Sequence, residues 1–149
     1  MNRIANTKDY LPIGRLLINA FRAFERELLN RLQSQGFDDV TLSHLNVIRH
    51  LNPEGMRLIE LAHDATLSKQ AITKITQNLK QKAYIIISND PEDGRAKMIY
   101  FSPRGTALVK TAISITQAIE SEYLETLGKP QFKSLRKSLQ TLSSEENND

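Results

Sequence analysis

One stretch of the chain combines side chains that can read a nucleic acid with a spacing that puts them on one surface. Gln70, Thr73, Lys74 and Gln77 recur at steps of about one helical turn and so share one face of a helix. Glutamine can pair with adenine through two hydrogen bonds, lysine can reach guanine or a phosphate, and a threonine methyl can touch the thymine methyl. This face has the chemistry that base readout needs.

The segment that contains this face is basic and free of acidic residues. Ser68 can cap the start of the helix, where its hydroxyl and the free backbone N–H groups suit a phosphate oxygen. Between Thr66 and Asn89 there is no acidic residue, whereas Lys69, Lys74, Lys80 and Lys82 are basic. A solvated helix face would explain lysines alone, but such faces usually also carry Glu or Asp. The pattern favours a nucleic acid as the partner.

A second candidate surface is a charged turn between two β-branched segments, 84–88 and 98–102. The segments predict a hairpin, and Arg95 and Lys97 project from its flexible tip, where an arginine can enter a minor groove. We interpret Asp93 as the acidic residue that orients Arg95 by an ion pair. A charged turn alone is weak support for binding, but a hairpin directly after a helix-turn-helix is far more specific.

The remaining composition excludes several classes of function. The chain has 149 residues, a net charge of +3 and no cysteine, so disulfides, thiolate metal sites and thiol redox chemistry are excluded. No Ser/His/Asp arrangement, glycine-rich phosphate loop or carboxylate pair is present, and we expect neither catalysis nor a cofactor. His44, His50 and His63 lack metal-ligand spacing, so we expect no metal. Without a secretory signal or a membrane span, a cytoplasmic location is expected.

Apolar residues at steps of three and four predict the helices that position these surfaces. Pro12 and Gly36 mark the ends of the first helix, Thr41 caps the second, and Ser68 caps the fourth. The third and fourth helices, joined by a short break at Thr66, form the helix-turn-helix pattern. The predicted helices span about 12–35, 42–51, 58–65, 69–82, 104–127 and 130–142. The fold class is therefore mainly α with a small β-hairpin wing.

With these elements in order, the sequence resembles the MarR family of winged helix-turn-helix transcription regulators. The resemblance covers almost the whole chain and is strongest at Leu58–Ala62, Leu67–Thr73 and Asp90–Arg95, followed by Phe101–Gly105. It implies a six-helix protein that forms a homodimer and binds double-stranded DNA at a pseudo-palindromic operator. It also implies repression relieved by a small, often phenolic or aromatic, anion.

Two positions depart from the family's pattern. Members usually carry glycine just after the recognition helix, where this chain has Ala83, and alanine in a left-handed conformation is strained by about 1 kcal/mol. The helix is therefore expected to end differently here. The wing often has a basic residue where this chain has Gly94, which leaves Arg95 as the only arginine at the tip and predicts fewer wing contacts.

The stripes on the first, fifth and sixth helices are too long for one small monomer to cover, which predicts a two-fold dimer. We expect one domain overall, with a dimerisation helix in 1–40, a DNA-binding lobe in 41–102, dimerisation helices in 103–143 and a disordered tail in 144–149. Phe21, Arg22 and Phe24 are candidates for an effector pocket, since an arginine near aromatic rings suits an aromatic carboxylate. The alternative is that the phenylalanines are dimer core and the arginine a surface charge.

A winged-helix module that binds an acidic protein partner is the rival interpretation of the whole chain. Such a module would usually present apolar or aromatic anchors on the surface of its fourth helix. The sequence shows none among Gln70, Thr73, Lys74 and Gln77, and so favours DNA.

Overall fold

The computed structural model describes residues 10–143 of the chain. The chain forms two compact units, Met1–Ala112 and Ile113–Asp149, whose boundary falls inside a long helix. The predicted tail at 144–149 lies outside the described residues. The first unit carries all of the residues expected to contact DNA.

The helices of the first unit follow the sequence-based prediction closely. They are α1 (Ile13–Ser34), α2 (Leu42–His50), α3 (Leu58–Asp64), α4 (Lys69–Gln81) and the beginning of α5 (Pro103–Leu127). Both predicted N-caps are present: the Thr41 hydroxyl accepts a hydrogen bond from the backbone of His44, and the Ser68 hydroxyl accepts one from the backbone of Ala71. The polar residues before each apolar stripe therefore fix where α2 and α4 begin.

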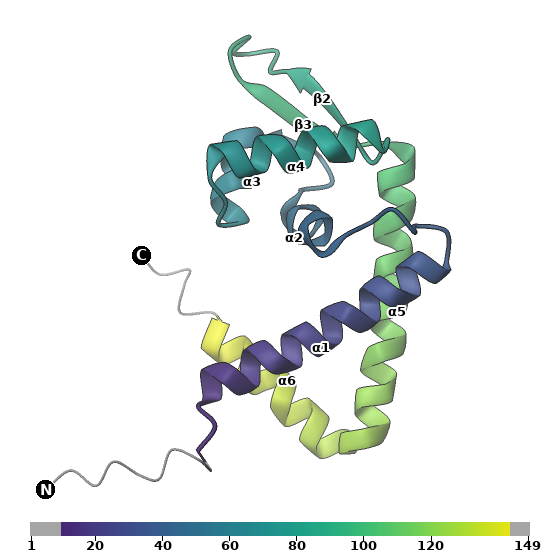
Figure 1. Ribbon diagram of the computed structural model, residues 1–149. Coiled ribbons are helices and arrows are strands. Elements are labelled where there is room, and N and C mark those ends of the chain that lie inside the picture. The colour runs from purple at the N-terminus through teal and green to yellow at the C-terminus, as the bar shows by residue number, and fades with distance from the viewer. Residues whose placement is uncertain (1–9, 144–149) are drawn as a thin grey trace, which may run out of the picture. The chain divides into compact units, whose positions relative to one another are not determined.

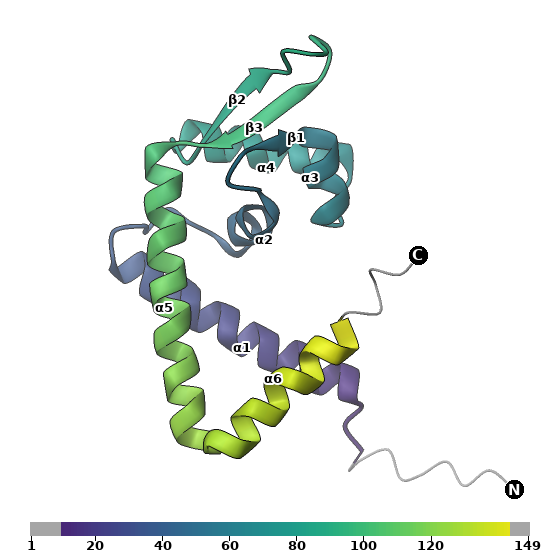
Figure 2. The same ribbon diagram turned by 180° about the vertical axis from the view of Figure 1, so that it is seen from behind.

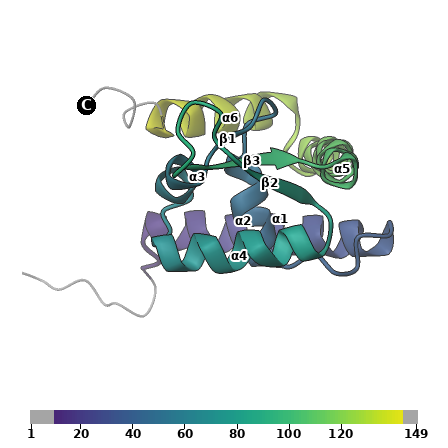
Figure 3. The same ribbon diagram turned by 90° about the horizontal axis from the view of Figure 1, so that it is seen from above.

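The hairpin is part of a three-stranded antiparallel sheet. Its strands are β2 (Ile85–Asn89) and β3 (Lys97–Phe101), and the third strand is the two-residue β1 (Met56–Arg57). β3 lies in the centre of the sheet, which Figure 3 shows from above. Met56 pairs with Ile99, so the segment that leads into α3 is hydrogen-bonded to the wing. Figures 1 and 2 show the hairpin extending beyond α4, and Figure 2 shows β1 beside β3. No pattern in the sequence predicts β1.

Three helices of this unit end in the same way. After α1, α3 and α4 one residue takes a positive φ, and the residue that follows donates its N–H to a carbonyl five positions earlier, which is a Schellman motif. Gly36 fills the position after α1, but Thr66 fills it after α3 and Ala83 after α4, with φ of 56° and 64°. The prediction that α4 ends differently because it lacks glycine is therefore wrong. Ala83 takes the left-handed conformation itself.

The core of the first unit gathers under the hairpin. Ile72 and Leu79 of α4, Leu61 of α3, Ile99 of β3 and Leu108 of α5 are all fully buried. These residues come from four different elements, and burial of their apolar surface holds α4 with its other face outward.

The second unit contains the rest of α5 and α6 (Lys129–Ser143). Gly128, with a φ of 81°, separates the two helices, as its place in the sequence predicted. Ile115 and Ile119 of α5 are buried, whereas no described residue of α6 is. Arg136 of α6 forms an ion pair with Glu120 of α5 at 2.8 Å.

Candidate nucleic-acid interface

The outer surface of α4 contains all six residues that the sequence predicted there. Each of them is exposed, and α4 has no acidic residue from its first position to its last. The exposed set consists of Ser68, Lys69, Gln70, Thr73, Lys74 and Gln77. On the opposite side, Ile72, Thr76 and Leu79 are buried. The helix is therefore divided into an apolar face that anchors it and a polar face that meets solvent.

Three hydroxyl groups of α4 are already engaged within the helix. The buried Thr76 hydroxyl donates to the Ile72 carbonyl at 2.7 Å, which satisfies its hydrogen-bonding need in the core. The Thr73 hydroxyl donates to the Lys69 carbonyl at 2.7 Å. Its methyl group is then the part of Thr73 left for a base, in keeping with the predicted contact to a thymine methyl. The Ser68 oxygen accepts a bond as N-cap, and its proton can still be donated to a phosphate.

The tip of the wing places both predicted basic side chains in solvent. Arg95 and Lys97 are exposed, and the Lys97 ammonium donates to the Asn89 side chain across the hairpin at 2.8 Å. Asp93 does fix Arg95, but it accepts the backbone N–H of Arg95 at 3.1 Å rather than pairing with the guanidinium. The predicted ion pair was therefore wrong. Within residues 10–143 the Arg95 side chain has no partner, so it can turn toward a ligand.

The ion pair at the wing forms instead between its base and the strand before α3. Arg57 Nε donates to Asp90 Oδ2 at 2.7 Å, and the Asp90 carboxylate is almost fully buried. Asp90 Oδ1 also accepts the backbone N–H of Glu92 at 2.9 Å. That backbone bond, together with Arg57, lowers the pKa of Asp90 despite the opposing effect of burial. The contact fastens the hairpin to the beginning of the helix-turn-helix.

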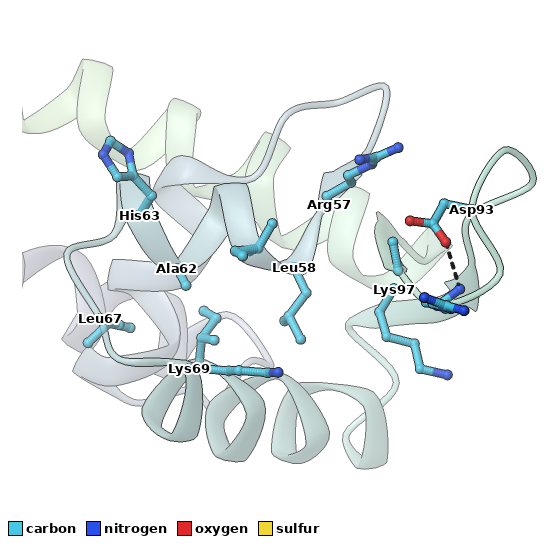
Figure 4. Close-up of a pocket in the computed structure, with 12 residues that line it drawn as sticks. Arg57, Leu58, Ala62, His63, Leu67, Lys69, Asp93 and Lys97 are labelled. Carbon is cyan, nitrogen blue, oxygen red and sulfur yellow. Dashed lines mark hydrogen bonds between the residues drawn. The ribbon is translucent and has the colours of Figure 1, made fainter.

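A groove with a volume of about 560 Å³ runs between α3, the start of α4 and the wing. Figure 4 shows Leu58, Ala62 and Leu67 beside it and Arg57, Lys69 and Lys97 around it, with Asp93 as its one acidic residue. Lys69, Arg95 and Lys97 thus border one continuous hollow, whereas Lys74 lines a separate hollow beside α2. This surface suits a polyanion that contacts both elements at once.

The buried side chain of His44 connects α2 to α4. His44 Nδ1 accepts the backbone N–H of Thr41 at 3.1 Å, so the proton of the neutral ring lies on Nε2, which is 2.6 Å from Asn78 Oδ1. Burial is the main cause of a lowered pKa at His44, and the nearby charge of Lys82 acts in the same direction. The ring is thus held as the tautomer that bridges the N-terminus of α2 and the last turn of α4.

The comparisons with known proteins agree with this arrangement. No protein-family model matches the chain. The chain is 26% identical over 138 residues to HTH-type transcriptional repressor Rv2887 of Mycobacterium tuberculosis, and the match covers 92% of this chain and 97% of that protein.

Solved structures show the same fold. MarR of E. coli in its apo form superposes with a TM-score of 0.73 at 20% identity, with 91% of this chain and 98% of MarR covered. The chain has the MarR fold. This confirms the resemblance seen in the sequence, and the expected fold class of six helices with a small winged sheet.

Two further proteins with a similar fold are described together with DNA or a small molecule. A variant of MepR from S. aureus, bound to an oligodeoxyribonucleotide, has a TM-score of 0.60 at 18% identity and covers 91% of this chain and 99% of its own. BpsR of Bordetella bronchiseptica, described for regulation of its DNA binding by 6-hydroxynicotinic acid, has a TM-score of 0.65 at 19% identity and covers 88% and 98%.

On this MarR fold, the three candidate effector residues all lie on α1. Arg22 is exposed and Phe24 is half-buried. The arginine that stacks on the Phe21 ring is Arg49 of α2, with its guanidinium carbon 5.0 Å from the ring centroid, and it also pairs with the buried Glu25 at 2.9 Å. An effector pocket at Phe21, Arg22 and Phe24 stays a prediction.

The contacts that hold the candidate interface in place were not predictable from local sequence. Arg57, Asp90, Asn78 and His44 stand far apart in the sequence, and only the paired strands and packed helices bring them together. One signal was available: a histidine three residues after Thr41 occupies the capping-box position usually held by Glu or Gln.

Among residues 10–143, no group of three or more His, Asp or Glu side chains is placed to hold a metal ion. His63 approaches Asp64 at 3.4 Å, and both side chains are exposed. None of the described helices has both the length and the apolar content that a membrane span requires.

Proposed function

We propose that the protein is a sequence-specific, double-stranded DNA-binding transcriptional repressor. The observation that carries the proposal is the exposed, acid-free face of α4, whose first residue, Lys69, borders a groove shared with Arg95 and Lys97 of the wing. Its relatives named as HTH-type transcriptional repressors, and a MarR-fold protein bound to an oligodeoxyribonucleotide, support the same function.

In this function the residues divide into two roles. Gln70, Thr73 and Gln77 read base edges in the major groove, while Ser68, Lys69 and Lys74 contact phosphates or guanine. Arg95 and Lys97 of the wing reach the adjacent minor groove or backbone. The protein acts by binding alone, without catalysis and in the cytoplasm. A protein-binding module is less well supported, because the outer face of α4 offers no large apolar anchor.

We further propose that the working form is a homodimer. Many large apolar side chains of the three predicted dimerisation helices are exposed in the single chain, including the stripe Ile13, Leu16, Leu17 and Phe21 on α1 and the stripe Leu135, Leu139 and Leu142 on α6. Burying such stripes against a second copy is favourable by about 25 cal/mol per Å² of apolar surface. Two-fold symmetry would place two recognition helices about 34 Å apart on a pseudo-palindromic operator.

A small aromatic or phenolic anion is proposed as the effector that releases the operator. Support comes from the MarR-fold protein BpsR, whose DNA binding is described as regulated by 6-hydroxynicotinic acid. Phe21, Arg22 and Phe24 are the candidate residues. Calorimetry with salicylate as the probe tests them, and an Arg22→Gln variant that binds millimolar salicylate as well as the parent protein would remove Arg22 from the site.

DNA binding itself is tested by titrating the protein with duplexes selected from a random pool and with the DNA upstream of its own gene. We expect tight, strongly salt-dependent binding to the selected duplexes. Lys97→Gln should weaken binding to all duplexes alike and lower the salt slope by about one. Lys110→Gln, an exposed lysine on α5, removes the same charge away from the interface and serves as control. A protein that shifts no DNA at low ionic strength would contradict the proposal.

A further inference from the structure

The C-terminal end of α4 is fastened to the beginning of α5 by three consecutive carbonyl groups. The carbonyl of Lys82 accepts a hydrogen bond from the Arg104 guanidinium, and that of Ala83 accepts one from the Ser102 hydroxyl. The carbonyl of Tyr84 accepts the backbone N–H of Ser102 at 3.1 Å. Carbonyls beyond a helix end usually turn to water. Here all three are bound by two residues of one neighbouring segment.

Arg104 connects this end of α4 to a third segment. Its guanidinium lies over the Tyr84 ring, with the central carbon 4.2 Å from the centroid, and both of its terminal nitrogens are 3.3 Å from the Asp39 carboxylate. The Tyr84 hydroxyl donates to the same carboxylate. Asp39 belongs to the connection between α1 and α2. We call Asp39, Tyr84 and Arg104 the joint.

The backbone at the joint is packed without spare room. A Cβ atom on Gly105 would lie 2.0 Å from the Tyr84 carbonyl oxygen, so no other residue fits there unless the two segments move apart. The Tyr84 side chain is fully buried and Ser102 nearly so. Close-packed contacts of this kind resist small displacements.

The charges at the joint are mutually supporting. Burial opposes ionisation of Asp39, but the hydrogen bond from Tyr84 and the charge of Arg104 outweigh it and lower the pKa of the carboxyl group. Burial, and then the bond to Asp39, raise the pKa of the Tyr84 hydroxyl. At neutral pH the joint therefore contains an ionised Asp39 and a neutral Tyr84.

We propose that Asp39, Tyr84 and Arg104 are positioning residues that set the angle of α4 on α5, and thereby the affinity for specific DNA, without contacting DNA themselves. This inference rests on the function proposed above. A helix of 13 residues is about 20 Å long, so a tilt of about 10° at its C-terminal end moves its N-terminal end by about 3 Å. That displacement exceeds what a bidentate hydrogen bond from Gln70 tolerates.

Non-specific binding should depend much less on this angle. Flexible lysine side chains follow a phosphate over several ångströms, whereas glutamine side chains must meet base edges in a fixed geometry. Loosening the joint is therefore expected to lower the ratio of specific to non-specific affinity. Loss of a phosphate contact would instead lower both affinities and change the salt slope.

The test compares Arg104→Gln with Lys110→Gln, which removes the same charge from an exposed position six residues along the same helix. Binding is measured by anisotropy at fixed salt to a duplex selected by the wild-type protein, and to a scrambled duplex of equal length. We expect Arg104→Gln to weaken binding to the selected duplex about two- to thirtyfold, with an unchanged salt slope and a smaller loss on the scrambled duplex. Tyr84→Phe, which removes only the hydroxyl, should give a smaller loss of the same kind.

Amide hydrogen exchange separates this inference from the proposed function. Arg104→Gln should speed exchange at the amides of Ala83, Tyr84 and Ser102 more than in the rest of the protein, while Lys110→Gln should not. Equal ratios of specific to non-specific affinity in Arg104→Gln and wild type would overturn the inference. So would exchange that rises uniformly over the chain, since that would show a loss of global stability only. If the wild-type protein selects no duplex, the proposed function fails. The role of the joint is then tested separately, because unchanged exchange at these three amides in Arg104→Gln would overturn it.

Discussion

Replacing Ala83 by glycine should stabilise the protein, although glycine usually weakens a chain. Ala83 has a φ of 64° and is exposed, so its methyl group gains no burial to offset the left-handed backbone. That conformation costs an L-residue about 1–2 kcal/mol. Glycine pays nothing for it but loses about 0.5–1 kcal/mol more conformational entropy on folding. The net gain for Ala83→Gly is therefore about 0–1.5 kcal/mol, centred on about 0.75 kcal/mol.

The measurement is urea unfolding at a fixed protomer concentration, since dimer formation makes apparent stability depend on concentration. For a chain of this length, 1 kcal/mol also raises Tm by about 2–4 °C. Ala107→Gly is the matched control: Ala107 is exposed within α5, where glycine should cost about 1 kcal/mol. Ala83→Asn should behave like alanine or slightly better, because asparagine tolerates the left-handed region.

The opposite signs of the two glycine substitutions are the decisive result. If Ala83→Gly destabilised the protein as much as Ala107→Gly does, the left-handed end of α4 would be refuted. Stabilisation by Ala83→Gly would also show that this chain retains at Ala83 a strain that the glycine of the related family avoids. Thr66→Gly, at the φ of 56° between α3 and α4, should stabilise for the same reason.

Three further predictions concern pH, the wing and base readout. The pKa of His44 is lowered in the folded state, so the folded protein binds fewer protons than the unfolded chain. The free energy of unfolding should therefore fall as the pH drops below about 6.5. His44→Gln, which keeps a capping-box residue, should flatten that dependence in urea titrations from pH 5 to 8. Asp90→Asn removes the charge that holds Arg57 and should speed amide exchange at Ala96 in the wing, whereas Asp93→Asn should not. Equal exchange rates at Ala96 in the two variants would show that the Arg57–Asp90 ion pair does not hold the hairpin. Gln70→Ala and Gln77→Ala should each relax base preference at one position of a selected duplex by about 1–3 kcal/mol, whereas Gln117→Ala on α5 should leave base preference unchanged. Equal losses of affinity on all sequences would mean that Gln70 and Gln77 contact only the DNA backbone.

The sequence was sufficient to predict the elements because their signals are local. The apolar stripes, the caps at Thr41 and Ser68 and the turn at Gly128 each act within a few residues, and the structure has the helices where they indicate. The polar face of α4 was also predictable, since an amphipathic helix has only one side to bury.

Contacts between distant segments could not be predicted in the same way. The two-residue strand β1 is too short to show an alternating pattern, and its pairing depends on β3 about forty residues later. Asp93 was favoured over Asp90 as the partner of an arginine because it is nearer to Arg95 in sequence. The sheet instead brings Asp90 to Arg57, a pairing that no local spacing indicates.

The outer face of α4 can change while the fold is kept, because other residues hold the helix in place. The N-terminus of α4 is set by Ser68, its middle by the buried Thr76, its last turn by Asn78, and its C-terminal end by the joint. None of these contacts uses the side chain of Gln70, Lys74 or Gln77. Substitutions at those three positions therefore alter what the helix can read without altering where it lies. Substitutions at the joint should instead move the helix, so they should both lower the ratio of specific to non-specific affinity and speed amide exchange at Ala83, Tyr84 and Ser102. Amide exchange therefore separates the two sets.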